Sequence, residues 1–125
     1  MTGDSTDYTI TFATTVIDRN ADFSSPTFTA PVTGQYVLSA TVNLEGLTAA
    51  ADYSKMRFVT SNRTYEIIWQ DTNDMPQPAF NFTILCDMDA ADTAIVKILV
   101  AGEAGVVVDL ATSSERTHFS GYLLG

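Results

Sequence analysis

The chain has 125 residues, a length that suits one domain and leaves no room for a second hydrophobic core. Hydrophobic residues make up 46% of the chain, enough to fill a core, whereas charged residues make up only 17%, below the roughly 25% usual for a soluble domain. Acidic residues outnumber basic ones by 15 to 6, for a formal net charge of −9. A surface of this sign repels phosphate groups and argues against nucleic acid and anionic membranes as partners.

Polarity alternates with a period of two along most of the chain, which is typical of strands with one buried face. Residues 1–7 are expected to be a flexible lead-in, and the alternation starts at Tyr8–Phe12. It is clearest over Gln35–Leu44, where every second residue is apolar. Further strands are predicted at Lys55–Thr60, Thr64–Trp69, Phe80–Met88, Ala94–Val100, Val106–Ala111 and His118–Leu124. Short strands joined by polar turns, with no helical period, predict a single all-β domain over residues 1–125, built as a sandwich or barrel.

Two of these segments, Thr93–Val100 and Phe119–Leu124, are apolar on both faces. An antiparallel strand of this kind is usually covered twice, once by its own core and once by something else. A subunit interface would supply the second cover, and a long loop over a central strand is the alternative. The low charged fraction favours self-association. We therefore expect a subunit interface whose residues include Ile95, Leu99, Tyr122 and Leu124.

Three segments resemble the complement C1q globular-head family, a branch of the tumour-necrosis-factor-like jelly rolls. The first is Phe28–Leu44, with its aromatic, proline and Thr-Gly-x-Tyr pattern, and the second is the turn Asp89–Thr93. The third is Thr117–Leu124, which resembles the family's closing Phe-Ser-Gly-aromatic-Leu-Leu strand. Ala91-Asp92 stands where the family usually has Gly-Asp, and the chain has neither a collagen-like stalk nor a cysteine pair. These departures fit the C1q-like tips of phage tail fibres and tailspikes better than the complement or hormone branches.

The resemblance implies a two-sheet antiparallel jelly-roll sandwich that assembles as a homotrimer. It also implies a recognition head, in a virion or outside the cell, that binds a host-surface glycan or protein receptor. A trimerisation cap without a ligand and a secreted C1q-like lectin or signalling ligand are the alternatives. The chain has no run of about 18 apolar residues, and Met1–Ser5 lack signal-peptide character. We therefore expect neither membrane insertion nor a signal peptide.

Catalytic residues are scarce, so we expect a protein that is not an enzyme. His118 is the only histidine, and the single cysteine, Cys86, falls inside a predicted strand, where it is expected to be a small buried hydrophobic residue. Ligands for zinc are lacking, and no cofactor is expected apart from a possible calcium ion. Closely spaced hard oxygen ligands suit calcium, and two acidic turns have them: Asp87, Asp89 and Asp92 in the favoured one, and Asp71, Asn73 and Asp74 in the other. Neither set matches an EF-hand loop, and solvated turns are the commoner explanation of such clusters.

The longest irregular stretch, Leu47 to Pro78, holds the candidate ligand-binding residues. Aromatic and polar side chains on loops are the usual means of recognition, and here they are Tyr53, Arg57, Arg63, Tyr65, Trp69 and Asn73. For Trp69 the favoured interpretation is a tryptophan packed into the core of an alternating strand. The alternative is that it stacks on a sugar through its apolar ring face while its polar neighbours hold hydroxyl groups.

Overall fold

The computed structural model describes all residues except 13, 16, 17, 19, 71 and 72, and every regular element in the described part is a β-strand. The strands are β1 (Tyr8–Thr9), β2 (Phe23–Ser24), β3 (Thr27–Thr29), β4 (Gly34–Glu45), β5 (Tyr53–Thr60), β6 (Thr64–Trp69), β7 (Ala79–Met88), β8 (Thr93–Ala101), β9 (Asp109–Leu110) and β10 (His118–Leu124). The long predicted strands are confirmed. The predicted strands Tyr8–Phe12 and Val106–Ala111 shorten to the two-residue strands β1 and β9.

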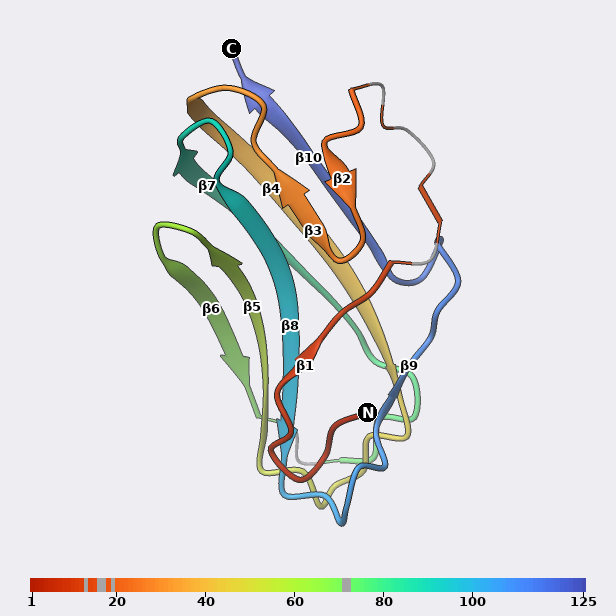
Figure 1. Cartoon of the computed structure of the whole chain (residues 1–125). Helices are drawn as coiled ribbons and strands as arrows, with labels where there is room; N and C mark the ends of the chain where they lie inside the picture. Colours follow the sequence, from red (N-terminus) through yellow and green to blue (C-terminus); the bar gives the residue numbers. More distant parts are fainter. Residues whose placement is uncertain (13, 16–17, 19, 71–72) are drawn as a thin grey trace.

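The strands form two antiparallel sheets, as Figure 1 shows. The first sheet has the order β2-β3-β8-β5-β6. On the same edge of β8, β3 pairs with the start of the strand and β1 pairs further along it, at Lys97 and Ile98. The second has the order β10-β4-β7, and β9 pairs with the end of β4. The protein is therefore all-β with two antiparallel sheets, as the sequence predicts, and its architecture has the character of a β-sandwich.

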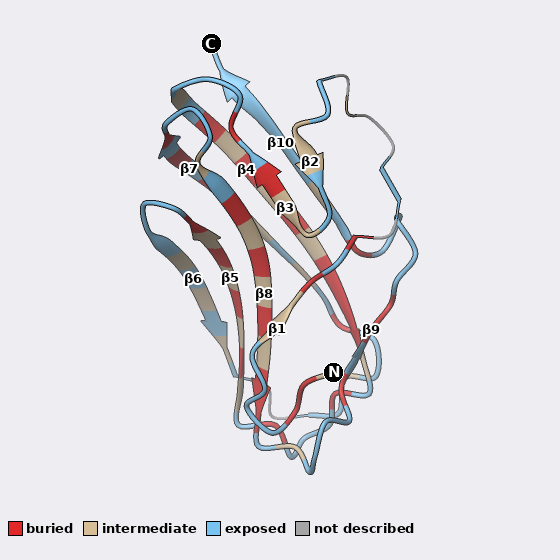
Figure 2. Cartoon of the chain, in the orientation of Figure 1, coloured by how far each residue is buried: buried red, intermediate tan, exposed pale blue. Residues whose placement is uncertain are grey.

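The core lies between the two sheets and follows directly from the period-two pattern. Figure 2 shows buried positions alternating with more exposed ones along β4 and β8. Inward residues include Leu38 and Val42 of β4, Phe58 of β5 and Val96 of β8, all fully buried. Cys86 of β7 is 2% exposed and belongs to the same core. Burying alternate side chains stabilises the fold by roughly 25 cal/mol for each Å² of apolar surface removed from water.

Residues 1–7 differ from the flexible lead-in expected from the sequence. Thr2 is 1% exposed, and its backbone exchanges hydrogen bonds with that of Val108. The Thr2 hydroxyl donates to the Thr6 carbonyl and accepts a hydrogen bond from the backbone N–H of Val100 (2.9 Å). A buried backbone N–H without an acceptor is costly. Thr2 therefore helps to complete the hydrogen bonding of β8, and residues 1–7 are part of the fold.

Candidate functional site

The outward face of the second sheet, here called the outer β4 face, carries an apolar row. Val37 of β4 pairs in register with Tyr122 of β10 on one side and with Leu85 of β7 on the other. Tyr122 is 60% exposed and Leu85 is 55% exposed, and Leu124, in the next row, is 49% exposed. By the same register and alternation, the rows from Gln35 to Thr41 of this face consist of His118, Ser120, Tyr122, Leu124, Gln35, Val37, Ser39, Thr41, Asn81, Thr83, Leu85 and Asp87. The name outer β4 face is kept for these rows, in which Asp87 is the only acidic residue; Glu45 and Asp109 pair beyond them, at the end of β4.

Four polar side chains of the outer β4 face, those of Ser39, Thr41, Asn81 and Thr83, are hydrogen-bonded to one another. The Asn81 amide donates to the hydroxyl of Thr41 (2.9 Å), the hydroxyl of Ser39 and the carbonyl of Ala40. The Ser39 and Thr83 hydroxyls are 2.9 Å apart, and Thr83 also donates to the Asn81 side-chain oxygen. Polar groups that already have partners can be covered without the penalty of an unsatisfied donor or acceptor. This half of the face is therefore compatible with burial against another surface.

The four predicted interface residues do not share one surface. Tyr122 and Leu124 lie on the outer β4 face, whereas Ile95 and Leu99 point outward from β8 on the first sheet, where both are half-buried. Lys97 stands between Ile95 and Leu99 on that strand. The sandwich separates these two outward faces. One flat contact therefore cannot cover all four residues.

A charged cluster occupies the first sheet's outward face next to Leu99. Arg57 of β5 pairs in register with Lys97 of β8, and the Asp7 carboxylate forms ion pairs with both side chains, the one with Lys97 at 3.3 Å. Partial burial raises the pKa of Asp7, but the hydrogen bonds and positive charges of Arg57 and Lys97 outweigh it and hold the pKa below its ordinary value. This face is therefore charged and internally paired.

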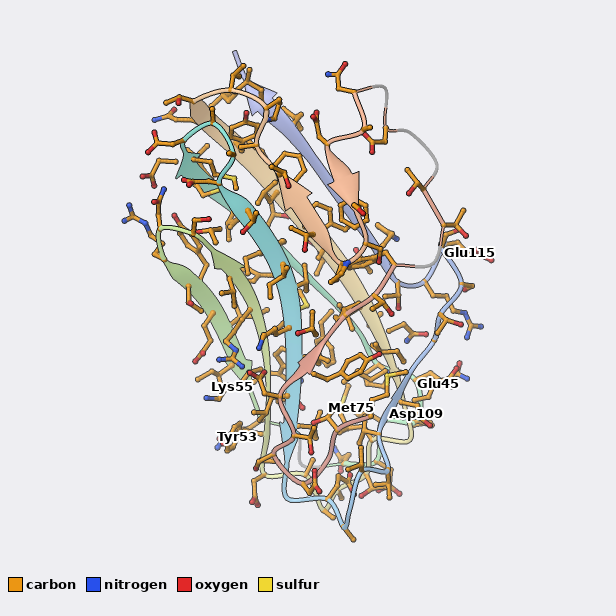
Figure 3. All side chains as sticks on the ribbon, in the orientation of Figure 1. Glu45, Tyr53, Lys55, Met75, Asp109 and Glu115 are labelled. Carbon is orange, nitrogen blue, oxygen red and sulfur yellow. The ribbon has the colours of Figure 1, made fainter. Side chains whose placement is uncertain are left out.

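The predicted ligand-binding residues are spread along the β5–β6 hairpin. Arg63 lies in its turn and forms an ion pair with Asp87 (3.0 Å). Trp69 ends β6, opposite Ser54, so the hairpin's length separates it from Arg63. Tyr53 and Trp69 both line a pocket of about 490 Å³ with Lys55, Ile68 and Gln70; Figure 3 labels Tyr53 and Lys55. By the strand register, however, Trp69 stands opposite the buried Ser54 and points inward, whereas Tyr53 lies on the outward face. Tyr65 is half-buried, with burial raising its pKa, and Asn73 is exposed in the β6–β7 connection. The structure therefore does not gather the predicted set into one site.

The Trp69 side chain packs against β7 of the second sheet. Its ring centroid lies 3.8 Å from that of Phe80 on β7, so one face of the indole is covered. Its Nε1 is buried and has no hydrogen-bond partner among the described residues. A stacking platform for sugar needs an open ring face. The packing against Phe80 leaves Trp69 poorly placed for that role.

Among the described residues, the carboxylates of the acidic turns are not gathered into a metal site. Asp87 binds Arg63, and the Asp92 carboxylate accepts a hydrogen bond from the backbone N–H of Asp89 (2.8 Å). In the second turn, the Asp74 carboxylate accepts from the N–H of Ala49 (2.9 Å), and Asp71 lies outside the described residues. Within the described part of the chain, no three Asp, Glu, His or Cys side chains are grouped so that they could hold a metal ion.

A larger pocket, here called the β2–β10 pocket, lies where the edge strands of the two sheets face each other. It has a volume of about 610 Å³, and its apolar residues are Phe12, Phe23, Phe28 and Phe119. Its polar residues are Thr14, Thr15, Asp18, Asn20, Asp22, Thr112, Ser114, Thr117, His118 and Ser120. The sequence analysis missed this pocket because its residues come from distant segments and share no local pattern.

The comparisons with known proteins add no family. No protein-family model matches the chain, and no curated protein is similar to it in sequence. In the part of the chain that the structure describes, no helix has the length and hydrophobicity to cross a membrane.

Proposed function

We propose that this protein is a non-enzymatic, homotrimeric jelly-roll recognition head of the C1q-like kind that ends phage tail fibres and tailspikes. Its role would be attachment to a glycan or protein on a host cell surface. The apolar row Tyr122–Val37–Leu85 on the outer β4 face carries the proposal. Large apolar side chains gathered on one exposed face mark surfaces that meet another protein.

The connectivity of the strands supports the jelly-roll part of the proposal. From β3 onward, the chain passes repeatedly between the sheets: β3 lies in the first, β4 in the second, β5 and β6 in the first, β7 in the second, β8 in the first and β10 in the second. Consecutive strands that pack across the core rather than side by side are a feature of jelly rolls built from Greek keys.

The charge distribution supports a second copy of this chain as the partner. Each copy carries a net charge of −9, so two copies repel each other unless their contact surfaces are nearly neutral. The rows from Gln35 to Thr41 of the outer β4 face meet this condition because Asp87 is their only acidic residue and is paired with Arg63. A basic partner protein would be expected to use an acidic surface instead.

A closed ring of three requires each subunit to present two different surfaces. The outer β4 face would be one. The edge where β6 and β7 lie side by side would be the other, since it carries the half-buried aromatic and aliphatic residues Tyr65, Ile67, Trp69, Phe80 and Phe82. The β6–β7 edge of each subunit would pack against the outer β4 face of the next subunit, and three such contacts would close the ring.

Light scattering on the purified full chain tests the proposal. We expect a mass three times the 13.5 kDa of one chain at micromolar concentration. A stable monomer or dimer would refute the trimer and, with it, the head proposed here. Binding of the fluorescently labelled protein to host-cell envelopes and to immobilised glycans tests the attachment role. A trimer that binds neither would be a trimerisation cap.

A further inference from the structure

We propose that the outward face of the first sheet binds an acidic saccharide, whose carboxylate is held by the side chains of Arg57 and Lys97. The inference deepens the proposed recognition role by naming a ligand class, and it rests on that role for the choice of a saccharide. It does not depend on the trimer. Arg57 is one of the residues that the sequence predicts to bind a ligand, whereas Lys97 is not.

Positively charged side chains are gathered on this face. Strand register and alternating burial place Lys55 and Arg57 of β5 next to Lys97 of β8, in two adjacent rows here called the cationic rows. All residues of these rows are described. The three cations are half of the six Lys and Arg residues of the chain, whereas two of its 15 acidic residues, Asp7 and Glu66, contact them. The cationic rows therefore keep a net positive charge on a chain that is acidic overall.

The Asp7 side chain shows that a carboxylate fits between Arg57 and Lys97. One of its oxygens forms an ion pair with Arg57, and the other lies 3.3 Å from the ammonium group of Lys97. A guanidinium group has five N–H donors and an ammonium group has three. In the hydrogen bonds of the described residues, each of these two groups donates once, to Asp7. Both cations therefore have donors left for a second carboxylate, which a ligand can supply.

Lys55 adds positive charge beside this pair. Its ammonium group lies 3.9 Å from the Glu66 carboxylate, longer than a hydrogen bond, and 5.5 Å from the centre of the Tyr53 ring. Charges on the protein surface are largely screened from one another beyond about 8 Å at physiological ionic strength. The acidic residues on other parts of the surface therefore weaken the local attraction for an anion only slightly.

The ion pairs of the cationic rows favour a small anionic group over a protein surface. A flat protein partner would remove Asp7 and Glu66 from water together with their cations, and the cost of desolvating such pairs can exceed the attraction gained. A single carboxylate on a sugar ring leaves most of these charges in contact with water. Leu99 and Ile68 stand on either side of Lys55, and Ile68 is 57% exposed, so both offer apolar surface to the C–H groups of the ring.

The proposed trimer leaves the cationic rows accessible. The outer β4 face belongs to the second sheet, and β6 separates Arg57 from the β6–β7 edge. Three copies of the site on one head can engage one surface simultaneously, so a weak site gains effective affinity without any new contact. Assembly and saccharide binding use different residues and are open to separate tests.

The experiment titrates the full chain, by calorimetry, with oligosaccharides that end in glucuronate or N-acetylneuraminate and with their carboxyl-reduced forms. We expect the carboxylate forms to bind and the neutral forms not to bind. Arg57→Gln is expected to weaken binding about 10-fold or more, the effect of one lost hydrogen bond between charged groups. Arg116→Gln removes the same charge from a half-exposed arginine before β10. It is the matched control and is expected to bind as the unmodified chain does.

A second pair of variants tests the competition between Asp7 and the ligand. Asp7→Asn removes the carboxylate that the chain itself places between the two cations, so binding is expected to strengthen about 3- to 10-fold. Glu115→Gln changes the net charge by the same amount at an exposed residue, and its affinity is expected to stay within about 2-fold of the unmodified chain. Urea denaturation of all four variants checks that each is folded.

Binding that requires the carboxylate and follows this order of variants supports the site. Equal binding of the carboxyl-reduced forms, equal losses in Arg57→Gln and Arg116→Gln, or equal affinities of Asp7→Asn and Glu115→Gln would overturn it. Binding of polyglutamate but of no acidic oligosaccharide would overturn it in favour of an acidic peptide.

Light scattering on the same samples keeps the two proposals distinguishable. A monomer that binds acidic saccharides refutes the trimer and leaves the site. A trimer that attaches to host-cell envelopes but binds no acidic saccharide refutes the site and leaves the recognition head.

Discussion

Tyr122 and Leu85 stand on either side of Val37, in one row across the three long strands of the second sheet. They belong to segments 37 residues apart in the chain, and both are more than half exposed (60% and 55%). The register of β4 with its two neighbours is what brings them onto one line. That line crosses rows of the outer β4 face in which Asp87 is the sole acidic residue, which makes it the natural place to test for self-association.

Replacing Tyr122 with aspartate is expected to dissociate the assembly. Each contact would then bury a carboxylate without a partner, at a cost of about 3 kcal/mol or more. Light scattering across a range of concentrations measures the result. Ile95→Asp, on the outward face of the first sheet, is the comparison and is expected to leave the mass unchanged. The opposite pattern, with only Ile95→Asp dissociating, would place the contact on the first sheet and contradict our assignment.

Gly121→Ala is expected to destabilise the sandwich by about 1–3 kcal/mol because the added methyl group would crowd a buried side chain. A Cβ at Gly121 would lie 2.7 Å from Cδ2 of Leu38, which is fully buried and has neighbours on the core side. Gly34→Ala is a matched control, since its Cβ would meet Cδ1 of Leu123, a side chain that is 45% exposed and free to turn. Urea denaturation at one fixed protein concentration compares the two variants. Equal losses would show that the contact with Leu38 is not the cause.

Asp7→Asn is expected to lower stability by about 1 kcal/mol or less at neutral pH, because the Asp7 side chain is 36% exposed and solvent screens its ion pairs. The pKa of Asp7 in the folded state is below its ordinary value of 3.8. The contribution of this carboxylate is therefore present above that pH and disappears as the pH falls through the folded-state pKa. Urea midpoints of the two proteins should differ at neutral pH and converge in acid below pH 3.8. Glu115→Gln, which removes an exposed charge without an ion pair among the described residues, should show no such convergence.

Cys86 is expected to resist alkylation in the folded protein. Burial raises the pKa of its thiol, and the neighbouring charge of Asp87 raises it further, while Arg63 acts weakly in the opposite direction. Since the thiolate is the reactive form, a buried thiol with a raised pKa reacts slowly. Mass spectrometry after treatment with iodoacetamide at neutral pH should find no adduct on the folded chain and complete labelling in urea. Rapid labelling without denaturant would mean that β7 opens readily.

Local pattern was sufficient to predict most strands. The alternation over Gln35–Leu44 identified β4, and the apolar runs around Ser61–Arg63 identified the β5–β6 hairpin. This works because successive side chains of a strand point to opposite faces, so one buried face appears directly in the order of residues. The same rule could not predict that Thr2 is buried. Its hydroxyl is buried because it accepts a hydrogen bond from the backbone N–H of Val100, a residue far away in the sequence.

The order of residues alone was enough to predict the all-β class, the positions of the long strands and the neutral, apolar character of the last strand. It could not predict that Ile95 and Tyr122 point away from opposite sides of the sandwich, or that Phe23 and Phe119 stack at a centroid distance of 5.5 Å, because both depend on the folded arrangement of the strands. The physical reason is that a period of two assigns each side chain to one of two faces of its own strand. It carries no information on which strands pair, and strand pairing is what joins distant residues into a surface or a pocket.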